Sequence, residues 1–131
     1  MPPTPPSANQ TLGQQGEAFA EAHLVNQGYT VLARRWRAGK LGELDRVLLS
    51  PCLRYVVGLE VKTRRPTSAS TGVEVPASKV ERLQRCLLAL MQTLPSTHPT
   101  LAGLQPRCDW MLVTLPHGGL PQYQHFENIG L

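Results

Sequence analysis

Two acidic residues and a lysine stand inside stretches of the sequence that are otherwise apolar. Asp45 lies within residues 43–49, and Glu60 and Lys62 lie within residues 55–63. Both stretches are rich in leucine and valine, which predicts two β-strands joined by a short turn. A charged side chain on a partly covered sheet costs free energy unless it is paired or binds a metal. The pattern therefore indicates a candidate site for metal binding or catalysis.

The alternation of side chains along a strand places Glu60 and Lys62 on one face of the sheet. Carboxylates from neighbouring strands are suitable ligands for Mg²⁺, and a nearby lysine can act on a water molecule or a phosphate. We therefore predict a metal site at Asp45 and Glu60, and we include Val61 in it. The simpler alternative is a surface ion pair between Glu60 and Lys62, worth at most about 1 kcal/mol. The acidic residue in the adjacent strand favours the metal site.

Basic residues flank the acidic ones on both sides, in a chain of net charge +4 and a pI near 9.3. Arg37 and Lys40 precede the first acidic segment, and Arg64 and Arg65 follow the second. Lys79 lies near the start of a predicted helix, where anions bind readily. This arrangement predicts contacts with a phosphate backbone. For the first basic cluster, a solvated surface is an equally good interpretation.

Two helices and four strands are predicted around these residues. Thr11 and Gln14 form a capping box that begins the first helix, and Gly28 ends it. The second helix begins at Pro76 and ends at Pro95. Strands are expected at residues 29–36, 43–49, 55–63 and 107–115, and a short strand near 123–126 is left unplaced. The order helix-strand-strand-strand-helix-strand predicts an α/β fold, with helices on both faces of a mixed sheet.

The length of 131 residues suits one domain, which we place at residues 12–131 after a Pro-rich disordered tail at residues 1–11. The chain has no apolar run of roughly 20 residues and no secretory signal pattern, so we expect a cytoplasmic protein without a membrane partner. The cysteine spacing fits neither a disulfide framework nor a zinc site. Small polar residues at 66–72 are a candidate flap over a bound substrate.

The combined motifs resemble those of the YraN-like family of predicted endonucleases, which is similar to archaeal Holliday junction resolvases and the PD-(D/E)xK group. The matching motifs are Gly16-Glu17, Gly28-Tyr29, Arg37, Gly42-Glu43-Leu44-Asp45, Glu60-Val61-Lys62-x-Arg64, Lys79 and Arg107-x-Asp109. This resemblance covers residues 12–115 and implies a restriction-endonuclease-like fold. It also implies Mg²⁺ or Mn²⁺ as the cofactor.

Carried over to this sequence, the resemblance implies that Asp45 and Glu60 are metal ligands and that Lys62 is the catalytic lysine. It also implies that Glu17 completes or supports the site, although a lone glutamate on a helix is ordinarily expected to face solvent. One departure is Arg46, which stands where the family usually has an aliphatic residue. The resemblance assigns no clear role to Glu43 or to Asp109.

The function expected from these features is metal-dependent hydrolysis of phosphodiester bonds in DNA, with branched and single-stranded DNA as candidate substrates. DNA is favoured over RNA, and a homodimer is suggested by analogy with resolvases, which cut two strands symmetrically. A nucleic-acid-binding module of the same fold without catalytic activity is the main alternative. A hydrolase acting on another phosphoester is a third interpretation, and it predicts binding with little salt dependence.

Overall fold

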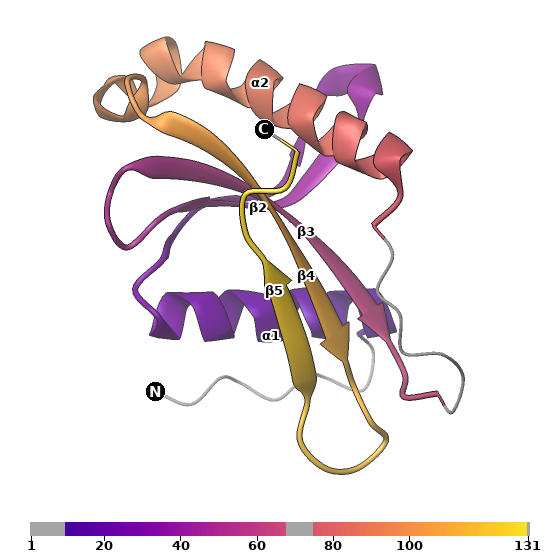
Figure 1. Ribbon diagram of the computed structural model, residues 1–131. Coiled ribbons are helices and arrows are strands. Elements are labelled where there is room, and N and C mark those ends of the chain that lie inside the picture. The colour runs from indigo at the N-terminus through magenta and orange to yellow at the C-terminus, as the bar shows by residue number, and fades with distance from the viewer. Residues whose placement is uncertain (1–9, 68–74, 131) are drawn as a thin grey trace.

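The computed structural model of the protein describes residues 10–67 and 75–130 (Figure 1). Residues 1–9 of the predicted tail lie outside the described part. The predicted flap at residues 66–72 likewise lies outside it from residue 68 onward.

Two α-helices and five strands make up the described chain, together with two short 3-10 helices. Their order is α1 (Leu12–Asn26), β1 (Thr30–Arg37), η1 (Gly39–Leu41), β2 (Glu43–Leu49), β3 (Tyr55–Arg64), α2 (Ala77–Thr97), η2 (Pro99–Leu101), β4 (Gln105–Thr114) and β5 (Gln122–Phe126). The predicted α/β class is confirmed.

All five strands form one mixed sheet in the order β1-β2-β3-β4-β5. The first three strands are an antiparallel meander, β4 joins β3 in parallel, and β5 returns antiparallel along β4. β4 is therefore interior, as its apolar residues on both faces predict. β5 was hard to place from sequence because its side chains are mostly exposed and give no strong apolar pattern.

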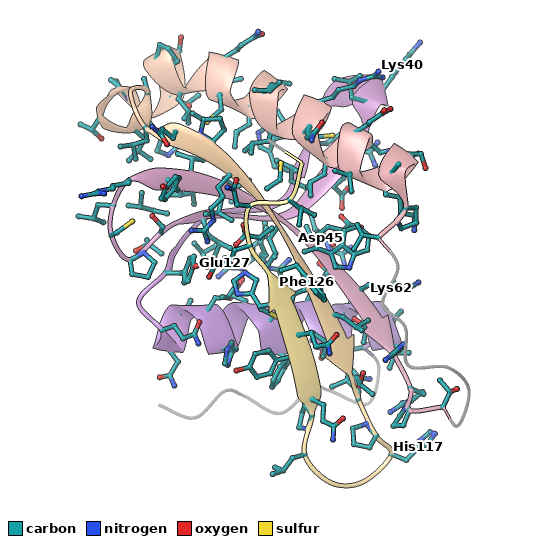
Figure 2. The ribbon with its side chains drawn as sticks, viewed as in Figure 1. Lys40, Asp45, Lys62, His117, Phe126 and Glu127 are labelled. Carbon is teal, nitrogen blue, oxygen red and sulfur yellow. The ribbon has the colours of Figure 1, made fainter. Side chains whose placement is uncertain are left out.

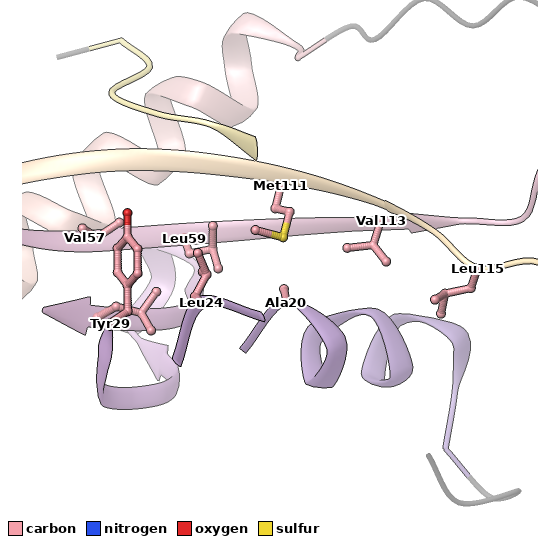
Figure 3. Packing of buried hydrophobic residues seen from close by; sticks show 9 residues of the cluster. Ala20, Leu24, Tyr29, Val57, Leu59, Met111, Val113 and Leu115 are labelled. Atoms are coloured by element: carbon pink, nitrogen blue, oxygen red, sulfur yellow. The ribbon is translucent and has the colours of Figure 1, made fainter. Parts of the chain in front are cut away.

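The two helices cover opposite faces of the sheet (Figure 1). Ala20 and Leu24 of α1 pack on Leu59, Met111 and Val113, which project from the central strands toward that helix (Figure 3). On the other face, α2 contributes its own stripe to a second core. That stripe consists of Leu83, Cys86, Leu87, Leu90 and Leu94, which pack with Leu44, Val47, Val56 and Cys108.

Helix α1 begins and ends as predicted. Thr11 and Gln14 exchange the two hydrogen bonds of a capping box, and Gly28 follows the helix with φ +102°, a conformation that favours glycine. The absence of a side chain at Gly16 lets the helix lie close to β3. A Cβ atom at this position would come 1.7 Å from the Oγ1 of Thr63.

Helix α2 differs from the prediction at its end. Pro95 lies inside the helix, which continues to Thr97. A proline removes only one backbone donor, and here it does so in the last turn. There the backbone N–H of His98 still bonds the carbonyl of Leu94 at 2.7 Å, and the hydroxyl of Thr97 bonds the carbonyl of Thr93 at 3.0 Å. Within the described residues, neither helix combines the length and the apolar character needed to span a bilayer.

Candidate active site

The alternation of side chains along strand β2 is irregular where the candidate acidic residue Asp45 lies. In strand β2, Leu44 packs in the core under α2, whereas Arg46 reaches the glutamates of α1 on the other face. Residues two apart in a regular strand share a face, so the alternation is broken at Asp45. In the register of the sheet Arg35 lies opposite Asp45, and its φ of +49° is in the left-handed region. Both strands therefore leave regular geometry at the same level.

This irregularity coincides with the end of the pairing between β2 and β3. The paired register of these strands stops at Arg46 and Leu59. Beyond it, the side chain of Asp45 takes the place of a backbone acceptor, and its Oδ2 receives the backbone N–H of Val61 at 2.8 Å. The Asp45 carboxyl group thus lies between the two strands, beside the side chain of Glu60.

The proximity of the two carboxyl groups changes their acidity. Burial and the negative charge of Asp45 raise the pKa of Glu60 to about 8, and the charge of Lys79 only partly opposes this effect. Burial also raises the pKa of Asp45, although the hydrogen bond from Val61 lowers it in part. With its pKa raised to about 8, Glu60 is mostly protonated near neutral pH.

A cavity of about 230 Å³ opens over this carboxyl pair. Its lining comes from the start of β2, from β3 and from the first two turns of α2. The lining residues are Gly42, Glu43, Asp45, Glu60, Lys79, Arg82 and Leu83. Three carboxyl groups, of which Glu43 is paired with Arg37, and two cationic side chains therefore line a space large enough for a phosphate group.

A network of ion pairs supports Asp45 from the opposite face of the sheet. Arg46 is buried and donates to Glu17 at 2.9 Å and to Glu21 at 2.8 Å. Its Nη1 also donates to the backbone carbonyl of Asp45 at 2.7 Å. Arg34 completes the network with a bond to Glu21 at 2.7 Å. The backbone at Asp45 is therefore held by a side chain that is itself anchored to helix α1.

With this geometry established, comparison with other proteins identifies the family. The model of the uncharacterised protein family UPF0102 matches residues 16–113. The chain belongs to this family.

Two relatives illustrate the similarity. A UPF0102 protein of Kineococcus radiotolerans is 38% identical over 124 residues, which cover 93% of this chain and 95% of the relative. A UPF0102 protein of Streptomyces coelicolor is 35% identical, and the match covers 94% of this chain and 91% of the relative. Among solved structures, Pyrococcus furiosus SfsA in complex with Ca²⁺ matches with a TM-score of 0.37 and 16% identity, over 95% of this chain and 74% of that one. The likeness to SfsA is too weak to support any argument.

In this UPF0102 protein, the other predicted catalytic residues lie outside the cavity. Lys62 is exposed two residues beyond Glu60, and its side chain extends outward from β3 (Figure 2). Glu17 is buried, which excludes the solvent-facing interpretation, and it binds Arg46 and also Arg35, the latter at 3.3 Å. Its negative charge nevertheless raises the pKa values of both carboxyl groups of the pair. Glu17 therefore acts on the site electrostatically and through Arg46.

The five residues predicted to contact nucleic acid also lie in different parts of the structure. Lys79 lines the cavity. Arg37 lies 3.6 Å from Glu43 in an ion pair, and Lys40 is exposed on η1 (Figure 2). The remaining two lie at the end of β3, where Arg64 bonds the hydroxyl of Thr114 and Arg65 bonds the carbonyl of Leu115.

Sequence reasoning missed Arg82 as a residue of the site. It lies three positions after Lys79 on α2, so the two side chains project to the same side of the helix. That helical spacing could have identified it. Glu43, whose role the sequence left open, lines the same cavity.

The Arg107-x-Asp109 motif of this family member forms a separate structural cluster. Asp109 is completely buried and accepts hydrogen bonds from Arg107 at 2.9 and 2.8 Å, from His125 at 2.8 Å and from the backbone N–H of Asn128 at 3.0 Å. Arg107 also donates to the hydroxyl of Tyr29 at 2.7 Å. The motif therefore attaches β5 and the segment after it to the interior of the sheet.

The donor set of the cavity suits a hard divalent cation bound by few protein ligands. Within residues 10–67 and 75–130, no three histidine, cysteine or acidic side chains gather into a metal cluster. Asp45 and Glu60 are nevertheless neighbouring oxygen donors that line one cavity, and the raised pKa of Glu60 indicates that added positive charge is favoured there. Mg²⁺ is commonly held by one or two carboxylates and several water molecules, so these residues fit it.

Proposed function

We propose that this protein is a metal-dependent endonuclease that hydrolyses phosphodiester bonds in DNA, with a restriction-endonuclease-like fold. The observation that carries the proposal is the proximity of Asp45 and Glu60 in a cavity that Lys79 and Arg82 also line. Carboxyl groups with raised pKa values, located in a cavity, are typical of functional sites. Branched and single-stranded DNA are the proposed substrates, and the cytoplasm is the proposed location.

Asp45 and Glu60 would hold Mg²⁺ or Mn²⁺ after Glu60 loses its proton. When bound, the cation supplies neutralisation of the charge that develops on the phosphate and lowers the pKa of a water molecule. The N–H of Val61 fixes the Asp45 carboxylate, so this ligand is oriented before the substrate arrives. Val61 would thus contribute through its backbone N–H, by holding Asp45 in place.

The cationic residues would position the DNA. Lys79 and Arg82 lie across the cavity from the carboxyl pair, where they can bind a phosphate group. Lys62 projects from the same face of β3 as Glu60 but outside the cavity. Its proposed role as the catalytic lysine therefore requires a substrate strand that passes from the cavity along the end of β3.

The test measures cleavage of labelled junction, flap and single-stranded DNA in the presence of Mg²⁺ or Mn²⁺. Asp45→Asn and Glu60→Gln should each reduce the rate at least about 100-fold, because each removes a metal ligand while keeping the side-chain volume. Arg54→Gln is the matched control, since Arg54 is exposed at the turn between β2 and β3, away from the start of α2 (Figure 1). Cleavage that persists in both ligand variants would refute the mechanism.

The alternative is a nucleic-acid-binding module without catalytic activity. The ion pairs of Glu17 with Arg46 and Arg35 favour it, because they hold Glu17 away from the cavity, where it could otherwise act as a further metal ligand. Metal binding separates the two functions. Mn²⁺ at ten times its Kd should stabilise the endonuclease by about 1.4 kcal/mol. A protein that binds DNA but shows neither cleavage nor stabilisation by Mg²⁺ or Mn²⁺ would be the binding module.

A further inference from the structure

Gly42 has a conformation and a contact that together point to Arg82. Its φ of +133° lies in the region that favours glycine. A Cβ atom at this position would lie 2.9 Å from the Cδ of Arg82 and 3.3 Å from its Cγ. The aliphatic stem of Arg82 thus packs directly on the backbone of Gly42, at the residue before β2 begins. A larger residue at position 42 would displace this arginine.

The charged end of Arg82 is available for a ligand. Arg82 is exposed, lines the cavity, and forms no ion pair within the described part of the chain. Lys79, on the same side of α2, also lacks an ion-pair partner among the described residues. By contrast, carboxylates already engage the neighbouring arginines of β1 and β2. These are Arg34, Arg35, Arg37 and Arg46.

We propose that Arg82, whose stem packs on Gly42, forms with Lys79 a binding subsite for a phosphodiester group of a single nucleic-acid strand. This inference deepens the proposed function and rests on it. An arginine fork can bind two phosphate oxygens at once, and a lysine beside it adds a second positive charge. Because the subsite faces Asp45 and Glu60, the strand would enter along the first turns of α2 and place one phosphate over the carboxyl pair.

The ion pairs of the β1 arginines favour a path of the nucleic-acid strand along α2 over a path along β1. Arg37 was one of the five predicted contacts, yet its charge is matched by Glu43, whereas Arg82 has no ion-pair partner among the described residues. A strand bound at the α2 side gains two unpaired cations without breaking an existing ion pair. Binding along β1 would first have to break the ion pairs with Glu17, Glu21 and Glu43.

The experiment measures binding of a fluorescent single-stranded oligonucleotide in EDTA over a range of salt concentrations. Arg82→Gln should weaken binding about tenfold, and it should reduce the slope of log K against log salt by about 0.7, the value for one lost phosphate contact to a single strand. Arg82→Lys should restore the slope but only part of the affinity. Arg54→Gln, which removes the same charge elsewhere, should change affinity much less.

Gly42→Ala provides an independent test. It leaves Arg82 in the sequence, but its Cβ atom occupies the space in which the stem of Arg82 packs. Its affinity should fall toward that of Arg82→Gln, with an unchanged circular dichroism spectrum. Equal affinities for Arg82→Gln and Arg54→Gln would overturn the inference. Polyglutamate that competes as well as DNA would also overturn it, since the subsite would then bind any polyanion.

The binding test is separate from the test of the proposed function. A parent protein that never cleaves DNA but loses binding in Arg82→Gln would refute the endonuclease and support the subsite. A parent protein that cleaves DNA with the same kcat and KM as Arg82→Gln would refute the subsite and support the endonuclease.

Discussion

The two faces of the sheet differ in how their buried carboxyl groups are paired. On the α1 face, Asp109 lies against Arg107 and Glu17 lies against Arg46, so each carboxylate has a guanidinium partner. Under α2, Asp45 and Glu60 lie against each other, and the nearby cations Lys79 and Arg82 remain unpaired within the described residues.

The pKa values of the buried carboxyl groups reflect this difference in pairing. Burial alone would raise the pKa of Asp109, yet the hydrogen bonds from His125 and Arg107 outweigh it and keep this pKa below its ordinary value. At Glu60, burial and the charge of Asp45 act in the same direction and raise the pKa. A carboxylate with a guanidinium partner recovers much of the free energy lost on burial, whereas an unmatched pair is retained at a cost in stability and is therefore the better candidate for function.

The largest effect that tests this comparison is expected at Asp109. Asp109→Ala should reduce the free energy of unfolding by about 3–5 kcal/mol, because it leaves Arg107 buried without its charged partner. Urea-induced unfolding followed by circular dichroism measures the loss. Asp45→Asn is the control on the other face and should cost far less, since it relieves repulsion at Glu60. A similar loss in both variants would show that the two faces do not differ.

A smaller effect is expected at Arg46, which joins the two faces. Arg46→Leu introduces the aliphatic residue that the family resemblance suggests at this position. It should cost about 1–3 kcal/mol, because Glu17 and Glu21 keep only their exposed arginine partners. It should also weaken Mn²⁺ binding about tenfold, since the backbone of Asp45 loses its anchor.

Calorimetry of Mn²⁺ binding and urea-induced unfolding separate these two consequences of Arg46→Leu. Glu21→Gln is a suitable control, because it weakens the same ion-pair network without touching the backbone of Asp45. Equal Mn²⁺ affinity in Arg46→Leu and the parent would mean that the network on the α1 face does not position Asp45.

Much of this arrangement is predictable from sequence because it depends on local patterns. The apolar runs around Asp45 and Glu60 predict adjacent antiparallel strands, and adjacent strands can bring their side chains together. The capping box and Gly28 predict the limits of α1 in the same way. These features depend on residues close in the chain, for which propensity and period are reliable guides.

What the sequence could not predict depends on breaks in those patterns and on contacts between distant residues. A sequence read with regular alternation does not reveal the irregularity at Asp45, because only the positive φ of Arg35 and the contacts of β2 on both faces define it. The contact of Arg82 with Gly42 joins residues 40 positions apart. The sequence also showed a cluster of basic residues, but not that glutamates neutralise several of them.

The smallest predicted effect concerns the pH dependence of stability at the unmatched pair. Glu60 has an ordinary pKa of 4.5 and a folded-state pKa of about 8, so between these values the folded protein holds a proton that the unfolded chain has released. The contribution of Glu60 is therefore fully present below about pH 4.5 and is lost as the pH rises toward 8.

Glu60→Gln removes this titration and should flatten the profile between these two pH values. At the upper end it should be more stable than the parent protein by on the order of 1 kcal/mol, a small value because the pair is partly open to solvent. Denaturation midpoints across this range measure the difference, and Glu43→Gln, which alters another carboxylate of the same cavity, is the control. Parallel profiles for Glu60→Gln and the parent would mean that Asp45 and Glu60 do not repel each other. The cavity would then resemble the matched face of the sheet, and the main reason to expect a cation between the two carboxylates would be lost.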